Sequence, residues 1–188
     1  MSFRLRCGAR SCAALLVMLL AACATAPAFA PAPAFELAGR IAVRYQARAF
    51  SSALRWKQDT LGDDIWLTAP LGQTIAHLQA DAGGATLTAA DQRQYRASSI
   101  ESLTRSALGW PLPLAGMRYW VLGLPAPGMV LSIIERDGAN RLARFRQDEL
   151  QVAINYATPG ATRPSRIEIT GADAEIRLVI DDLSTPQP

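Results

Sequence analysis

This sequence has few of the side chains that most catalytic and metal sites need. Its 188 residues include one histidine, His77, and three cysteines, at positions 7, 12 and 23. One histidine without free thiols cannot form an ordinary zinc site. No Gly-x-Ser-x-Gly elbow for a serine nucleophile and no phosphate-binding loop occur. We therefore expect no enzyme activity, no metal and no nucleotide cofactor, and we interpret His77 as a surface or internally satisfied residue.

Two pairs of adjacent aspartates are candidates for acid chemistry. Asp63-Asp64 and Asp181-Asp182 each fall near the end of an expected strand. Pairs of this kind are common in β proteins and usually serve turns or solubility. A glycosidase needs two carboxyl groups on opposite sides of a sugar, which this placement does not indicate.

Long hydrophobic runs are also scarce, and the longest one is near the N-terminus. Cys12 to Ala22 is an unbroken apolar run of 11 residues, preceded by Arg4, Arg6 and Arg10. As a helix it would be about 16 Å long, roughly half a bilayer core. The charged start and short apolar run are typical of a secretory signal rather than a membrane anchor.

The end of the run, Leu20-Ala21-Ala22-Cys23, resembles the bacterial lipobox. In such proteins the signal is removed before the cysteine, whose thiol is diacylated. We therefore expect residues 1–22 to be a lipoprotein signal peptide and Cys23 to be the lipid attachment site. The alternative is an ordinary signal with an incidental cysteine. By resemblance to proteobacterial lipoproteins, Ala24 rather than Asp favours passage to the outer membrane.

Cleavage changes the charge and thiol content of the protein. The precursor has 19 basic and 16 acidic side chains, and the signal removes three arginines and no acid. The mature chain is therefore neutral, and no free thiol remains in it. Several acyl chains give lasting membrane attachment. Without a basic excess, nucleic acid is not an expected partner.

Residues 23–34 are expected to be the acylated cysteine and a tether, and residues 35–188 the folded domain. Residues 24–34 contain three prolines and no charge. Such a segment is extended, at about 3.1 Å per residue or roughly 34 Å in all.

From Phe35 onward, short runs of alternating apolar and polar residues predict a mainly β protein. The alternation is strict from Phe35 to Gln46, where odd positions are apolar or glycine and even positions are mostly polar. Further strands are expected at 50–57, 64–69, 73–80, 84–90, 92–97, 130–136, 141–147, 149–157, 165–170 and 174–182. About ten or eleven strands at this spacing indicate an antiparallel sandwich or barrel.

Two helices are expected in the middle of the chain. Ser98-Ser99-Ile100-Glu101 matches a capping box in which Ser98 is the N-cap, and Gly109 is a plausible stop. A second helix is expected from Pro113 to Leu122, with Arg118 its only charge. Because it is apolar on most sides, it must be buried on most sides. It is either a plug that closes the sheet or a lid over an apolar cavity.

One large apolar residue lies at an expected hairpin tip, in Pro70-Leu71-Gly72. Proline and glycine suit a tight turn. Leu71 either folds back or projects into water. A projecting leucine would contribute about 1.5–3 kcal/mol when it enters a bilayer or an apolar partner.

Several segments, in this order, resemble the LolB family, the outer-membrane lipoprotein receptors of the Lol pathway. They are the lipobox Cys23, Phe35-x-Leu37-x-Gly39-Arg40-Ile41-Ala42-Val43, Leu54-Arg55-Trp56, the segment from Leu67 to Thr74 (LTAPLGQT), Gly109-Trp110-Pro111-Leu112-Pro113-Leu114, and the segment from Tyr119 to Pro125 (YWVLGLP). The resemblance covers residues 35 to about 180, and its last third matches mainly in strand pattern.

The resemblance implies an incomplete antiparallel β-barrel of about 11 strands, with short lid helices over an apolar cavity. It also implies that the protein accepts acylated lipoproteins from a periplasmic carrier of LolA type and inserts them into the inner leaflet of the outer membrane, without nucleotide hydrolysis. Clients, carrier and outer-membrane lipid are the expected partners of a monomer that faces the periplasm. Leu71 occupies the place of the leucine in the family's protruding loop, which favours projection.

The cavity-lining candidates are the apolar residues of the expected lid and of the apolar strand faces: Leu37, Ile41, Val43, Leu54, Trp56, Leu67, Met117, Tyr119, Trp120, Leu122, Val152 and Ile154. Arg40 and Arg44 could contact the carrier, although a solvated role is the default. Family members commonly have a longer polar segment before the first strand, which this chain lacks.

Two other classes of function share these features. A lipocalin-like lipoprotein that binds small apolar ligands would have the barrel and the anchor, although lipocalins usually place Gly-x-Trp near the first strand and this chain has Gly39-Arg40-Ile41. A structural accessory of an envelope assembly would need the anchor but no cavity.

Overall fold

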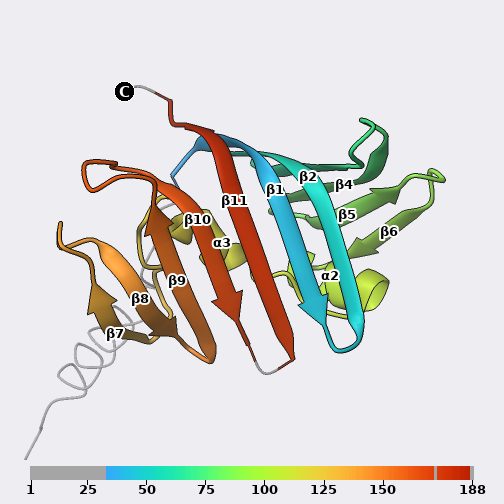
Figure 1. Cartoon of the computed structure of the whole chain (residues 1–188). Coiled ribbons are helices and arrows are strands. Elements are labelled where there is room, and N and C mark those ends of the chain that lie inside the picture. The colour runs from blue at the N-terminus through green and yellow to red at the C-terminus, as the bar shows by residue number, and fades with distance from the viewer. Residues whose placement is uncertain (1–32, 172, 187–188) are drawn as a thin grey trace, which may run out of the picture. The chain divides into compact units, whose positions relative to one another are not determined.

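The alternation of apolar and polar residues forms one antiparallel sheet of 11 strands in the computed structural model of the chain (Figure 1). The structure describes residues 33–171 and 173–186. The signal at 1–22, Cys23 and the tether up to residue 32 lie outside these residues. The strands are β1 (Phe35–Tyr45), β2 (Arg48–Asp59), β3 (Gly62–Thr68), β4 (Thr74–Asp81), β5 (Gly84–Ala89), β6 (Gln94–Ala97), β7 (Leu131–Arg136), β8 (Leu142–Gln147), β9 (Leu150–Tyr156), β10 (Pro164–Thr170) and β11 (Ala174–Ser184).

The sheet begins at β6 and ends at β7, so it is not closed into a full barrel. Its order is β6-β5-β4-β3-β2-β1-β11-β10-β9-β8-β7. The first and last strands of the chain, β1 and β11, therefore pair at the centre of the sheet. This confirms the expected fold class: the described residues form an incomplete antiparallel barrel of 11 strands with two short helices.

The pairing of β1 with β11 contains one irregularity. Ala38 lies opposite Asp182 and Gly39 opposite Ile180, so Asp181 is an extra residue on β11. A bulge of this kind changes which face the following side chains take. As a result Ile180 and Leu183 are both buried, while Asp182 is exposed on the other face.

Helix α2 (Ile100–Leu108) begins one residue later than the sequence indicates. Its N-cap is Ser99, whose hydroxyl accepts a hydrogen bond from the Ser102 amide. The expected capping box with Ser98 is wrong, because Glu101 accepts instead from the Ala115 amide of the next helix. Gly109 ends the helix as expected, with a φ of 88° that a residue with a side chain rarely adopts.

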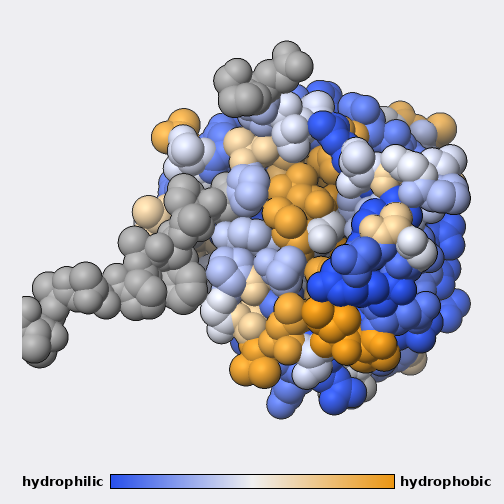
Figure 2. Space-filling model, turned by 90° about the vertical axis from the view of Figure 1, so that its left-hand side faces the viewer, coloured by the Kyte–Doolittle hydropathy of each residue, from blue (hydrophilic) through white to orange (hydrophobic). Residues whose placement is uncertain are grey.

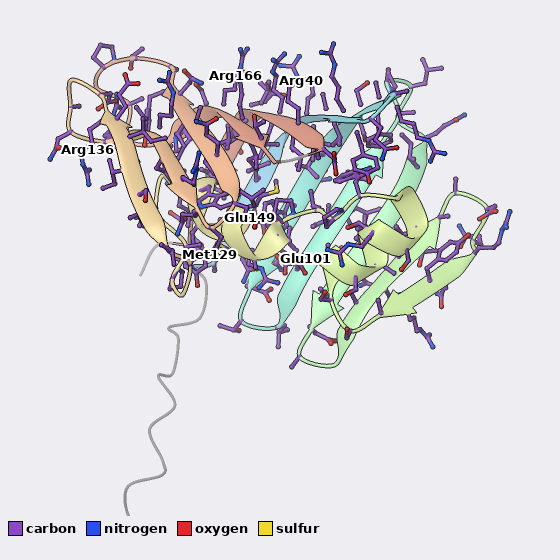
Figure 3. The ribbon with its side chains drawn as sticks, turned by 90° about the horizontal axis from the view of Figure 1, so that it is seen from below. Arg40, Glu101, Met129, Arg136, Glu149 and Arg166 are labelled. Carbon is purple, nitrogen blue, oxygen red and sulfur yellow. The ribbon has the colours of Figure 1, made fainter. Side chains whose placement is uncertain are left out.

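Helix α3 (Leu114–Trp120) is shorter than the expected 113–122, because the chain turns after Trp120. Both helices lie on one side of the curved sheet (Figures 1 and 3). We call the sheet face toward them the inner face and the opposite one the outer face. The apolar core lies between the inner face and the helices. Among the described residues, no helix combines the length and hydrophobicity needed to cross a bilayer.

Candidate functional site

Leu71 projects into solvent from the loop between β3 and β4. The loop is closed by hydrogen bonds from the Gly72 amide to the Ala69 carbonyl and from the Ala69 amide to the Gln73 carbonyl, both 2.8 Å. Gly72 has a φ of 82°, which its lack of a side chain permits. Leu71 is 91% exposed. Its side chain therefore projects into solvent and does not fold back onto the sheet.

An apolar cavity lies under the helices, against the inner face of β1 to β4. Its walls are Ile41, Phe50, Leu54, Trp56, Ile65, Leu67, Leu78, Thr104, Trp110, Leu112, Leu114 and Met117. Its volume is about 30 Å³. Ligand pockets usually measure about 300–1,000 Å³. Side chains therefore nearly fill the cavity, and a ligand with the size of an acyl chain could enter only if the helices moved.

The structure brings five of the twelve cavity candidates to this cavity: Ile41, Leu54, Trp56, Leu67 and Met117. Leu37, Val43, Trp120, Val152 and Ile154 are buried in the same apolar core, away from the cavity walls. Tyr119 and Leu122 are half-buried, and Leu122 packs against the core.

A buried ion pair joins α3 to the sheet beside the cavity. Asp63 on β3 accepts a hydrogen bond from the Trp56 indole at 2.8 Å and is paired with Arg118 of α3. The Asp63 side chain is fully buried, whereas Arg118 is partly exposed. Burial raises the pKa of Asp63, and the neighbouring Arg118 guanidinium and Trp56 indole act in the opposite direction. The pair therefore holds the helix against the sheet at the cost of burying a charge.

The connection between the two helices forms a wall between the cavity and a second, open cleft. Trp110 and Leu112 line the apolar cavity. Pro111 and Pro113 line a cleft of about 380 Å³, which is largely apolar and extends to the ends of β9, β10 and β11. Successive residues of the connection therefore face the cavity and the cleft in turn.

Hydrogen bonds hold this wall in place. The buried hydroxyl of Thr104 accepts from the Leu112 amide at 2.9 Å and donates to the Ile100 carbonyl at 2.9 Å. Glu101, labelled in Figure 3 on the helix side of the sheet, accepts from the Ala115 amide at 3.2 Å. Thr104 therefore holds the connection at Leu112, and Glu101 holds the start of α3 at Ala115.

The far end of α3 is fixed to β8 by Gln147, which is fully buried. Its amide oxygen accepts from the Trp120 indole at 2.6 Å and from the Ala126 amide at 2.8 Å. Its amide nitrogen donates to the Ala126 carbonyl at 2.8 Å. Both polar atoms of the side chain thereby have a partner inside an apolar core, which fixes the position of the Trp120 ring.

Sequence reasoning missed the polar residues of this site. Asp63 was expected in a turn or solubility role, but it is buried. The signal was present, because Asp63 has the same parity as Ile65 and Leu67, which face inward on the same strand. Thr104 and Gln147 carried no comparable signal. The partners of Gln147 are 21 and 27 residues away, and the Leu112 amide that bonds to Thr104 lies beyond the end of its helix.

The remaining candidate residues lie elsewhere. His77 is half-buried, contacts Asp64 at 2.5 Å and stacks on Trp66. Arg40 and Arg44 are on the outer face, and Arg40 forms an ion pair with Asp181 at 2.9 Å. Figure 3 shows Arg40 pointing away from the helices. In the part of the chain that the structure describes, no group of three His, Cys, Asp or Glu side chains could hold a metal ion.

Comparison with known proteins identifies relatives of this chain. A sequence profile described as "Outer membrane lipoprotein LolB" matches residues 33–182. The protein of that name from Nitrosomonas europaea is 37% identical over 151 residues, which cover 78% of this chain and 71% of the relative. The one from Chromobacterium violaceum is 33% identical over 174 residues, which cover 88% and 93%.

A solved structure of a LolA superfamily protein from Nitrosomonas europaea aligns with 85% of this chain and 89% of its own, at 9% identity and a TM-score of 0.48. That likeness is too weak to support an argument. The sequence matches are strong and span nearly all of the described residues, and the resemblance noted in the sequence motifs is confirmed by them. The chain belongs to the LolB family of outer-membrane lipoproteins.

Proposed function

We propose that this protein is the outer-membrane receptor that takes acylated lipoproteins from a periplasmic carrier and releases them into the inner leaflet of the outer membrane. The observation that carries the proposal is the wholly apolar cavity beneath α2 and α3 in a protein of this family. Acyl chains cannot be left exposed in water, because each CH₂ group contributes about 0.8 kcal/mol when it is buried. The inner face of the sheet offers a place to bury them.

Acceptance of a client requires the wall to open. The acyl chains would enter through the apolar cleft beside Pro111 and Pro113 and displace the connection that carries Trp110 and Leu112. The apolar residues of the inner face would then cover the chains. The Asp63–Arg118 pair and the Thr104 hydrogen bond oppose this movement, so binding of the chains must compensate for their loss.

Release needs contact with the bilayer, and Leu71 is our candidate for it. An exposed leucine at a loop tip contributes about 1.5–3 kcal/mol on insertion, which aids docking but is too little to anchor a protein. Lasting attachment would come from the lipid on Cys23. If each acceptor binds the chains more tightly than the one before it, transfer from carrier to receptor to bilayer is downhill and requires neither catalysis nor a cofactor.

The test is direct transfer. The protein lacking residues 1–23 is mixed with a purified carrier–lipoprotein complex, and the two proteins are separated by affinity capture. The lipoprotein should move to this protein without added nucleotide. A lipoprotein that stays on the carrier would contradict the proposal and favour a lipocalin-like binder of small apolar ligands. Binding of a fluorescent fatty-acyl probe without lipoprotein transfer would favour the same alternative.

A further inference from the structure

A hollow of about 490 Å³ lies on the outer face of the sheet, over β11, β1, β2 and β3. These strands are neighbours in the sheet, and the hollow is on the face away from the helices (Figure 1). We call it the outer hollow. Its side chains include Glu36, Arg55, Lys57, Asp64, Trp66 and Asp182. It lies on the opposite side of the sheet from the apolar cavity, and the proposed binding of acyl chains does not involve it.

One wall of the outer hollow is an aromatic ring held in a fixed orientation. Trp66 is 40% exposed and stacks on His77 of the next strand, with ring centroids 3.7 Å apart and an angle of 15° between the planes. His77 is in turn held by Asp64 at 2.5 Å. Because Trp66 lies directly opposite His77 on β4 and Arg55 on β2, the ring face away from His77 is directed toward the hollow.

The β-bulge provides a second wall. With Asp181 as the extra residue, Asp182 lies opposite Ala38 and joins the outer hollow, whereas unbroken alternation would have turned it inward. Bulges often redirect side chains in this way. The small side chain of Ala38, between Arg55 and Asp182, leaves the floor of the hollow open.

The charged groups around the Trp66 ring are of both signs, and most of them are free to bind a ligand. Within the described part of the chain, no hydrogen bond or ion pair involves the side chains of Glu36, Arg55 or Asp182. Lys57 has only a 3.5 Å contact with Asp59. Cations and carboxylates alternate across the strands, so no patch of one sign is formed. A phosphate or a cation would meet a like charge next to each opposite one.

We propose that the outer hollow binds a short saccharide chain. The negative π-face of Trp66 suits the polarised C–H groups on one face of a sugar ring. Hydroxyl groups both donate and accept hydrogen bonds, so they fit carboxylates and a guanidinium placed side by side. The volume lies within the range of small-ligand pockets. This inference does not depend on the proposed lipoprotein transfer.

The experiment uses the intrinsic fluorescence of the full-length protein, purified in a polyoxyethylene detergent that carries no sugar. Trp56, Trp110 and Trp120 are buried, so a collisional quencher such as acrylamide reports mainly on Trp66. The probes are tetramers of N-acetylglucosamine, cellotetraose and maltotetraose. At least one should protect Trp66 from quenching, with a Kd of about 1 mM or lower.

The variants separate stacking from general surface effects. Calorimetry measures saccharide binding by each variant. Trp66→Ala should weaken binding about tenfold or more, and Trp66→Phe should retain part of the affinity. Asp182→Asn should weaken binding severalfold. Tyr95→Ala is the matched control, since Tyr95 is a similarly exposed aromatic on β6 and should leave binding unchanged. Trp66→Ala and Asp182→Asn should both still accept lipoprotein from the carrier.

Three results would overturn the proposal. The first is the absence of binding by all three tetramers. The second is binding that is unchanged in both Trp66→Ala and Asp182→Asn. The third is Trp66-dependent binding of phosphatidylglycerol or phosphatidylethanolamine vesicles with no saccharide binding, which would assign the hollow to lipid headgroups.

Discussion

At the scale of single residues, the exposure of Leu71 follows from its two neighbours. Pro70 fixes its own φ, and Gly72 adopts a positive φ that closes the turn. The side chain between them has no strand partner, and it meets only solvent. A large apolar group in this position has no role in folding, so its substitution tests function with little effect on stability.

We expect Leu71→Glu to accept lipoprotein normally and to fail in delivery. Losing the insertion of a leucine costs about 1.5–3 kcal/mol, so transfer to liposomes should fall about tenfold or more. Leu61→Glu is the control, because Leu61 is also exposed at a hairpin tip but lies at the other end of β3. Normal delivery by Leu71→Glu, or an equal loss in both variants, would exclude the docking role.

Asp63 affects how stability depends on pH. Burial raises its pKa in the folded protein above the usual 3.8. Its contribution to stability is therefore fully present below that unfolded value and is lost as the pH rises through the folded one. Asn at this position does not titrate, so we expect the wild-type protein to gain stability relative to Asp63→Asn as the pH falls from 7 toward 4.

Urea unfolding of both proteins across that range measures the difference between their free energies of unfolding. The comparison cancels the titration of the other carboxyl groups. Asp137 provides a contrast, because Arg141 and nearby amides hold its pKa below the usual value. For Asp137→Asn the difference should change in the opposite direction, with wild type losing its advantage as the pH falls. A flat difference for Asp63→Asn would show that Arg118 offsets the burial.

At the scale of elements, the connection between α2 and α3 lies between the cavity and the open cleft. It is short, contains two prolines, and is held at Leu112 by the buried Thr104 hydroxyl. Replacing this hydroxyl leaves the Leu112 amide without its partner in an apolar setting. An unsatisfied buried amide costs about 1–3 kcal/mol.

We therefore expect Thr104→Val to lower the free energy of unfolding by about 1–3 kcal/mol, measured in urea. Because the same bond holds the wall, a fluorescent fatty-acyl probe should bind more rapidly to this variant. Ser106→Ala is the control, since Ser106 donates to the Ser102 carbonyl on the exposed side of α2. Unchanged probe kinetics in Thr104→Val would mean that the wall opens elsewhere.

The strands were predicted to within two residues at each end, whereas the start of α2 and both ends of α3 differ from the expectation. Period-2 alternation reports a face that is buried along the whole strand, and this signal is local. The start of α2 depended on which of two adjacent serines caps it. Glu101 had two possible partners, and the one it takes belongs to α3, which lies beyond the reach of a local pattern.

At the scale of the whole molecule, the sheet leaves an apolar edge at β7. Every residue of this strand is exposed, and Val130, Leu131, Ile133 and Ile134 contribute to the hydrophobic surface on that side (Figure 2). Exposed apolar edge strands promote association between chains, and a charged side chain on the edge opposes it.

We expect Ile134→Lys to reduce self-association of the lipid-free protein at high concentration, as followed by sedimentation velocity. Its free energy of unfolding should change by less than about 0.5 kcal/mol, because the side chain is exposed. Leu61→Lys makes the same change at a remote exposed leucine and is the control. Equal effects of the two variants would show that net charge rather than the β7 edge is responsible.

The sequence by itself determined the class of fold, the strands, the projecting loop as a candidate and the family. These depend on local alternation, turn residues and motif order, all of which can be read along the chain. The tertiary structure decided that the cavity is nearly filled, that Asp63 is buried against Arg118, and that the bulge brings Asp182 to the hollow beside Trp66. Each of these results depends on side chains far apart in sequence that meet only when strand register and helix position are set together.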